Sequence, residues 1–104
     1  MNILQRANEI INERSEEKER EYGPMDNGIE RIAKLVSIFR NKEITPEDVY
    51  WVLISLKLSR ESNKHKEDNL LDLVAYIGAY SNYCNKKAEQ KENNDIQTNN
   101  FNVQ

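Results

Sequence analysis

One predicted helix constrains the fold of this chain more than any other feature, because it starts at a clear signal and is apolar on two sides. In ITPEDV, Thr45 is a good N-cap residue, Pro46 suits the first helical position, and Asp48 stands where a capping box has its acid. The helix that follows, residues 46–60, has one apolar face made of Val49, Val52, Leu53 and Leu56 and another made of Tyr50, Trp51, Ile54 and Leu58. A helix that is apolar on both sides packs against a neighbour on each, so we expect it at the centre of a helical bundle.

Three other segments show the same helical spacing of apolar residues. Residues 2–20 form a first predicted helix, whose charged part at 14–21 is a solvated extension, and the sequence Tyr22-Gly23-Pro24 breaks it. A second helix follows a cap at Asp26 or Asn27, and the last runs over residues 67–84. Their expected buried residues are Ile3, Leu4, Ala7, Ile10 and Ile11; Ile29, Ile32, Ala33, Leu35, Val36 and Phe39; and Leu70, Leu71, Leu73, Val74 and Ile77. No strand alternation appears, so the sequence predicts an all-α bundle of about four helices.

The end of the chain has a different composition. After Cys84, residues 85–104 are rich in Asn, Lys, Glu and Gln, and such a segment buries too little apolar surface to offset the entropy of ordering it. We therefore expect a helical bundle domain over residues 1–84 and a disordered polar tail over residues 85–104.

Size and charge limit the partners and the compartment. The chain has 104 residues, which favours one domain, and its net charge of -3 gives no general attraction to nucleic acid or acidic membranes. A single cysteine fits a reducing compartment, and neither a membrane-spanning segment nor a signal peptide is apparent, so we expect a cytoplasmic protein. A core of this size is marginal, which predicts a homo-oligomer, with a dimer as the first expectation.

Two aspartates mark the candidate site. Asp68 and Asp72 lie one helical turn apart in the apolar run DNLLDLVAYIGAY, where together they can bind one divalent cation or one basic side chain. The positive N-terminus of the helix is a sufficient explanation for Asp68, whereas Asp72 lies one turn deeper and needs a partner. The same face carries Ala75, Tyr76, Ala79 and Tyr83, which predicts a cleft or a subunit interface there.

Lys57 is the expected partner of Asp72. It lies inside an apolar helix, where an unpaired ammonium is unfavourable unless the side chain reaches solvent, and Arg60 is a second candidate cation. These groups form either a structural ion network or a phosphate-binding site. His65 is expected to be solvated, and the sequence offers neither a glycine-rich phosphate loop nor a zinc ligand set.

Three segments resemble a family of small helical domains of unknown function found in tailed phages and prophages. They are EYG with ERIA, EITPEDV leading to LISLKLSR, and HKEDNLLDLVAY, within residues 3–82. Lys57 and Arg60 match the basic pair of that family, and Asp68, Asp72 and Tyr76 match its Asp-x3-Asp-x3-Tyr pattern. The chain departs at Pro24-Met25, where the family has Asp-Pro, and at Gly28, where it has Asn. The resemblance implies an all-α bundle and a phage or mobile-element origin.

A more distant similarity is to the MazG-like all-α nucleotide pyrophosphohydrolases, which bind magnesium through acidic pairs on two helices. Asp68, Asn69 and Asp72 resemble one half of such a site. The other half should be a Glu-x-x-Glu pair, of which the second helix offers only Glu30 on its outward face. Magnesium as a cofactor is therefore tied to this resemblance alone.

The leading hypothesis is a non-catalytic, phage-type accessory or interaction module in a bacterial host. In it, Asp72, Asp68, Lys57, Arg60 and Tyr76 form a polar cluster that is structural or binds a small phosphate-bearing ligand such as a nucleotide. One alternative is a magnesium-dependent nucleotide pyrophosphohydrolase with a reduced site at Asp68 and Asp72. Another is a nucleic-acid-associated protein that uses the basic segment 59–66, although the acidic balance of the chain argues against it.

Overall fold

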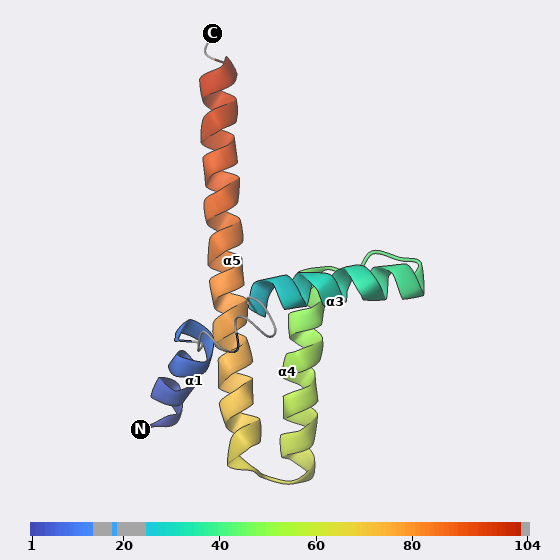
Figure 1. The fold of residues 1–104 in the computed structure, drawn as a ribbon, viewed down its shortest axis with the longest axis vertical. Coiled ribbons are helices and arrows are strands. Elements are labelled where there is room, and N and C mark those ends of the chain that lie inside the picture. Colours follow the sequence, from blue (N-terminus) through green and yellow to red (C-terminus); the bar gives the residue numbers. More distant parts are fainter. Residues whose placement is uncertain (14–17, 19–24, 103–104) are drawn as a thin grey trace.

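The computed structural model is all-α, and its long axis follows a single helix (Figure 1). The structure describes residues 1–13, 18 and 25–102, with side chains up to residue 94. The helices are α1 (Ile3–Asn12), α3 (Met25–Arg40), α4 (Pro46–Asn63) and α5 (Glu67–Asn102). The predicted all-α fold is confirmed. The charged run at 14–21 and the break at 22–24 fall outside the described residues, except for Lys18.

α4 and α5 form an antiparallel pair, α1 lies along α5, and α3 leaves the start of α4 at a wide angle (Figure 1). The most extensive contacts are those of α4 with α5, α1 with α5, and α3 with α4. α4 thus has two neighbours, as predicted, but its two apolar faces are only partly covered, since Trp51, Val52, Leu56 and Leu58 are exposed. None of the helices in the described ranges is long and apolar enough to cross a membrane.

The predicted start of α4 is present in full. Asp48 N–H donates to the Thr45 hydroxyl at 3.2 Å, and Thr45 N–H donates to the Asp48 carboxylate at 2.9 Å. Pro46 occupies the first turn, where its missing N–H is not needed. An unforeseen capping box starts α1, where Asn2 and Gln5 exchange two hydrogen bonds of 2.9 Å each. Both helices thus begin where side chains satisfy their free amides.

The start of α3 differs from the prediction. The helix begins at Met25, so Asp26 and Asn27 lie within its first turn rather than at the N-cap position. Asp26 instead forms an ion pair with Lys86, whose ammonium lies 2.7 Å from the Asp26 Oδ2 atom. At the other end, Asn41 adopts a left-handed φ of 52°, which terminates the helix. The Ser37 hydroxyl donates to Ala33 O at 2.7 Å and accepts from Ile44 N–H at 2.9 Å, which fixes the turn into α4.

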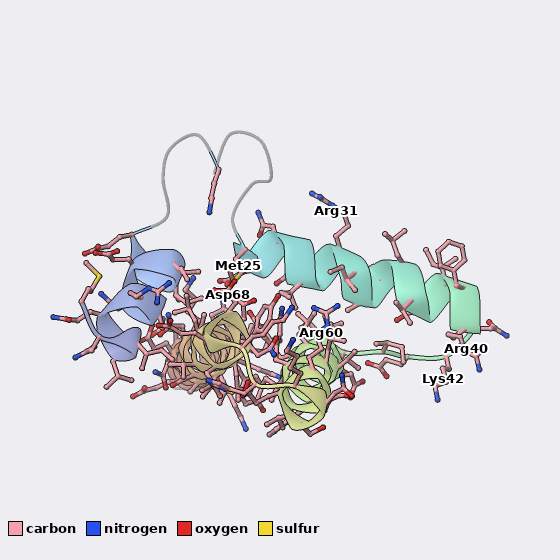
Figure 2. The ribbon with its side chains drawn as sticks, turned by 90° about the horizontal axis from the view of Figure 1, so that it is seen from below. Met25, Arg31, Arg40, Lys42, Arg60 and Asp68 are labelled. Atoms are coloured by element: carbon pink, nitrogen blue, oxygen red, sulfur yellow. The ribbon has the colours of Figure 1, made fainter. Side chains whose placement is uncertain are left out.

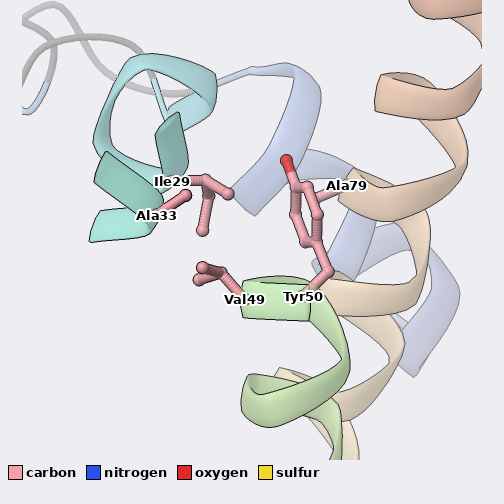
Figure 3. Packing of buried hydrophobic residues seen from close by; sticks show 5 residues of the cluster. All are labelled: Ile29, Ala33, Val49, Tyr50 and Ala79. Atoms are coloured by element: carbon pink, nitrogen blue, oxygen red, sulfur yellow. The ribbon is translucent and has the colours of Figure 1, made fainter. Parts of the chain in front are cut away.

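Tyr50 is the centre of the main core (Figure 3). Its ring is fully buried and meets the rings of Tyr80 and Tyr83 with centroids 5.5 and 5.6 Å apart. The other buried members of this cluster come from three helices and are Ile29, Ala33, Val49 and Ala79. A second cluster joins α1 to α5 through Ala7, Leu71 and Ala75. The two clusters together connect the other three helices to α5.

The buried faces of α3 and α5 differ from the predicted stripes. Ile29 and Ala33 are buried, but Ile32, Leu35 and Phe39 are exposed, because α3 contacts α4 only near its own first half. On α5 the buried residues are Asn69, Leu71, Ala75 and Ala79, whereas Ile77 is exposed. The alanine face of α5, expected to border a cleft or a subunit interface, is therefore covered within the chain. Small side chains there allow α1 and Tyr50 to approach closely.

α5 continues through the segment for which the sequence predicts a polar tail. Its 36 residues span about 54 Å at roughly 1.5 Å per residue, most of the 61 Å length of the molecule. Lys86 pairs with Asp26, and Lys87 pairs with Glu47 at 2.8 Å, so the first turn after Cys84 contacts the starts of α3 and α4. Hydrogen bonding to Glu47 raises the pKa of Lys87, and the same contact lowers the pKa of Glu47. A domain boundary at residue 84 stays a prediction.

Tyr50 carries a buried hydroxyl that has no hydrogen-bond partner among the described residues. A buried polar group without a partner is unfavourable by about 1–3 kcal/mol. We therefore expect Tyr50→Phe to leave the free energy of unfolding unchanged or to raise it by about 1 kcal/mol, as measured by urea denaturation. Tyr50→Ala, the control for the ring itself, should lower it by about 3–5 kcal/mol. A clear loss of stability in Tyr50→Phe would show that the hydroxyl is bound.

The Tyr50 hydroxyl should lose its proton at a higher pH than an exposed tyrosine does. Burial, and then the nearby charge of Asp26, raise the pKa of Tyr50 from 10.0 to about 12. Between these values the unfolded chain loses the proton and the folded chain keeps it, so this group's contribution to stability is present below pH 10 and declines as the pH rises towards 12. The difference in tyrosinate absorbance between wild type and Tyr50→Phe should show this late step. A difference curve centred at pH 10 would contradict the burial.

Candidate functional site

The antiparallel pairing of α4 and α5 brings Lys57 to Asp72. The Lys57 ammonium lies 2.8 Å from the Asp72 Oδ2 atom. The two side chains differ in exposure, since that of Lys57 is 12% exposed and that of Asp72 is 40% exposed. The ammonium is thus largely removed from water, and this carboxylate is its partner at the seam between the helices.

The other predicted site residues lie near this pair without joining it. Asp68 is exposed in the first turn of α5, and Arg60 is exposed in the last turn of α4. Figure 2 shows both at the end of the helical pair, on the side where α3 lies. Tyr76 is half-buried one turn beyond Asp72. In the described part of the chain, the structure connects only Lys57 and Asp72 among the five predicted residues by a direct ion pair.

A hollow lies where α4 turns into α5, and we call it the junction hollow. It is lined by Ser59, Arg60, Asn63, Lys64, Lys66 and Asn69. Three of these residues are cations and the others are neutral hydrogen-bonding groups. From the sequence, Arg60 belongs to the predicted polar cluster, and residues 59–66 form a separate basic segment. The two features meet because Asn69, on α5, lies opposite the end of α4.

Asn69 is the buried polar residue of this region, with 8% of its surface exposed. Its side-chain N–H donates to Lys64 O at 3.4 Å, and its backbone N–H donates to Lys66 O at 3.0 Å. Asn69 therefore links the connecting loop to the first turn of α5. The signal that could have identified it is an amide inside an apolar helical run, which needs partners when it is buried.

Glu61 stabilises the same loop from α4. Its carboxylate contacts the His65 ring and accepts from Lys66 N–H at 3.3 Å. Burial by itself would raise the pKa of Glu61, but the hydrogen bonds from His65 and Lys66 outweigh it and the pKa is lowered. His65, expected to be solvated, is exposed and paired with this carboxylate. The loop is thus held by one acid, while no ion pair of Arg60, Lys64 or Lys66 occurs within the described residues.

The acidic residues do not gather into a metal centre in the ranges that the structure describes. No group of three or more His, Cys, Asp or Glu side chains there could hold a metal ion. Asp72 is engaged by Lys57, and Glu30 is exposed on α3. The acidic run at 16–21 falls outside the described residues apart from Lys18. The arrangement of Asp68 and Asp72 therefore offers a divalent cation at most one carboxylate that is not already in an ion pair.

The two members of the Lys57–Asp72 pair should respond unequally to mutation. Asp72→Asn leaves a largely buried ammonium without its counter-charge, so we expect a loss of about 1–3 kcal/mol in the free energy of unfolding. Lys57→Met leaves a carboxylate that water can reach, and the methionine keeps the apolar packing, so a loss below about 1 kcal/mol is expected. Urea denaturation of both variants and the double mutant measures this. Equal losses, or the reverse order, would contradict the difference in burial.

Comparison with known proteins assigns this chain to a family. The model described as "Domain of unknown function (DUF6378)" matches residues 2–83, which include all four helix starts and both sides of the junction hollow. The "Gene 55 protein" of Mycobacterium phage L5 is 39% identical over 80 residues, covering 75% of this chain and 49% of that protein. The chain thus spans about half the length of this relative. No solved structure matches the chain. The chain belongs to the family of the domain of unknown function DUF6378, which has a phage relative.

Proposed function

We propose that the chain is a non-catalytic accessory module of phage type whose junction hollow binds a small phosphate-bearing ligand. The observation that carries this proposal is the meeting of Arg60, Lys64 and Lys66 around one hollow. In a chain with a net charge of -3, such a concentration of positive charge is local. The sequence pattern centres the candidate site on Asp72, whereas the proposed ligand site lies at the end of the helical pair.

The chemistry of the lining suits a phosphate group. Arg60 presents a planar guanidinium that donates to two oxygens at once, and two ammonium groups add further charge-assisted hydrogen bonds. Ser59 and Asn63 supply neutral donors at the same rim. Lys66 directly precedes α5, whose first turn carries the carboxylates of Glu67 and Asp68. A phosphate, with close to two negative charges and three acceptor oxygens, matches this set of donors.

The Lys57–Asp72 ion pair positions the two helices whose ends line the hollow. Lys57 precedes Arg60 by three residues on α4, and Asp72 follows Asn69 by three residues on α5. Their 2.8 Å contact fixes the register of the two helices one turn away from the hollow. Asp72 and Lys57 are therefore positioning residues in this proposal, and Arg60 and Lys64 are the ligand-binding residues.

The acids of the region favour binding over turnover. Phosphoryl chemistry that depends on magnesium needs several oxygen ligands around the metal ion. In the part of the chain that the structure describes, Asp72 already contacts Lys57, and Asp68 lies exposed at the helix start. This supports a module that holds a ligand and argues against the pyrophosphohydrolase alternative.

The test measures binding of inorganic pyrophosphate and of a nucleoside triphosphate by calorimetry at low salt. We expect the double variant Arg60→Gln, Lys64→Gln to weaken binding at least about tenfold, since each charge-assisted hydrogen bond contributes about 1.5–3 kcal/mol. The matched control is Arg31→Gln, Lys34→Gln, which removes the same charges from the exposed surface of α3 and should change the affinity less than threefold.

Three outcomes would reject the proposal. The first is the absence of binding by either probe, and the second is an equal loss in the control variant. The third is magnesium-dependent release of pyrophosphate from a nucleoside triphosphate that Asp72→Asn abolishes, which would establish the hydrolase instead. Single-stranded nucleic acid is titrated in parallel, and a higher affinity for it than for the nucleotide would favour the nucleic-acid alternative.

A further inference from the structure

α3 and α4 enclose an apolar groove at the corner where they separate. The groove is lined by Ile32, Val36, Ile44, Val49, Val52 and Leu53, with the Asp48 carboxylate at its edge. That carboxylate is already engaged by Thr45 N–H. The groove therefore offers a partner an apolar surface on two helices of different direction (Figure 1).

Further large apolar side chains extend this groove along both helices. Ile32, Leu35 and Phe39 recur at helical spacing on α3, and Val52 and Leu56 do so on α4. Phe39 is 80% exposed and Val52 is 66% exposed, values typical of charged surface residues rather than of phenylalanine and valine. We call the groove and these side chains together the α3–α4 corner.

The second half of α3 has large apolar side chains that the core does not cover. Ile29 and Ala33 anchor the first half, but the exposed members of the stripe lie after them. A helix of 16 residues is marginal in water on its own, and helices in proteins are stabilised mainly by packing of their apolar face. A partner that is always present with the chain satisfies this requirement, and a second copy is such a partner.

We propose that the α3–α4 corner is the surface through which two copies of this chain associate. At roughly 200 Å² per fully exposed large side chain, the five exposed residues of the corner present on the order of 500 Å² of apolar area. A stable interface takes about 800 Å² from each partner, and about 65% of a homodimer interface is apolar. The exposed apolar area of one corner therefore matches what one half of a homodimer interface requires.

The charge of the corner permits two identical surfaces to meet. On α4, Ser55 and Ser59 lie beside Val52 and Leu56. The charged residue that lines the groove is Asp48, whose carboxylate accepts from Thr45 N–H. A symmetric contact places each residue near its own copy or near a neighbour of it, and like charges at such a contact would repel. The other residues that line the groove are apolar, and the Asp48 carboxylate is held by its own helix cap, which limits this repulsion. The residues that line the groove differ from those that line the junction hollow, so this proposal does not depend on phosphate binding.

The oligomeric state of the full chain tests the proposal by sedimentation equilibrium over a range of concentrations. We expect the wild type to have twice the mass of the chain and Val52→Glu to raise the dissociation constant by about 100-fold or more, because an unpaired carboxylate is unfavourable in an apolar interface. The matched control is Leu58→Glu, also on α4 and with its leucine 52% exposed, but outside the corner. This control should remain dimeric.

A second variant keeps the test decisive if Val52→Glu affects folding. Phe39→Ser removes a side chain that contributes little to the core of one copy, so circular dichroism and the urea midpoint extrapolated to low concentration should be unchanged while dimerisation weakens. A wild type that is monomeric at about 100 μM would overturn the proposal, because interfaces of this size normally associate well below that concentration. Dimers that persist in both Val52→Glu and Phe39→Ser, or that Leu58→Glu disrupts equally, would also overturn it.

Discussion

Burial of Tyr50 is the constraint on which the arrangement of the helices depends. Its ring extends from the first turns of α4 into the space between α3 and α5, where Ile29 and Ala79 contact the cluster around it (Figure 3). Because Ala79 is small, the backbone of α5 can approach α4 closely enough to enclose the ring. The same approach sets the register in which Lys57 meets Asp72 further along the pair. The core and the candidate site are consequences of one packing geometry.

The sequence predicts local features, such as where a helix starts, better than it predicts which face of a helix is buried. The capping box at Thr45 and Asp48 depends on residues three apart, so reading the chain is sufficient to find it. The stripe on α3 is also real, but periodicity does not indicate how much of it another helix covers. Ile29 is buried and Phe39 is exposed although both belong to one stripe, because the angle between α3 and α4 decides their burial. On α5, the predicted stripe is made of Leu70, Leu71, Leu73, Val74 and Ile77. Of these five residues only Leu71 is buried, together with Ala75 and Ala79.

Part of the candidate site is also predictable from local sequence. A lysine inside an apolar helix and an aspartate one turn into the next suggest each other, and the structure brings Lys57 and Asp72 together. The junction hollow depends on the loop between the helices, whose path no periodicity specifies. From the sequence, Lys64 and Lys66 belong to a basic segment between two helices, and the hydrogen bond from Asn69 to Lys64 O holds this segment against α5. Composition does not indicate the ion pairs of Lys86 and Lys87, because their partners lie 60 and 40 residues away in the sequence.

The turn between α3 and α4 has a consequence for the apolar corner beside it. The left-handed backbone of Asn41 and the two hydrogen bonds of Ser37 determine the direction in which α3 leaves α4. The opening of the corner is therefore specified by polar groups that contribute no surface to it. Related chains that keep every apolar residue of α3 and α4 but differ in this turn would present the same side chains at another angle. Selectivity among otherwise similar copies could in this way reside in a serine and an asparagine.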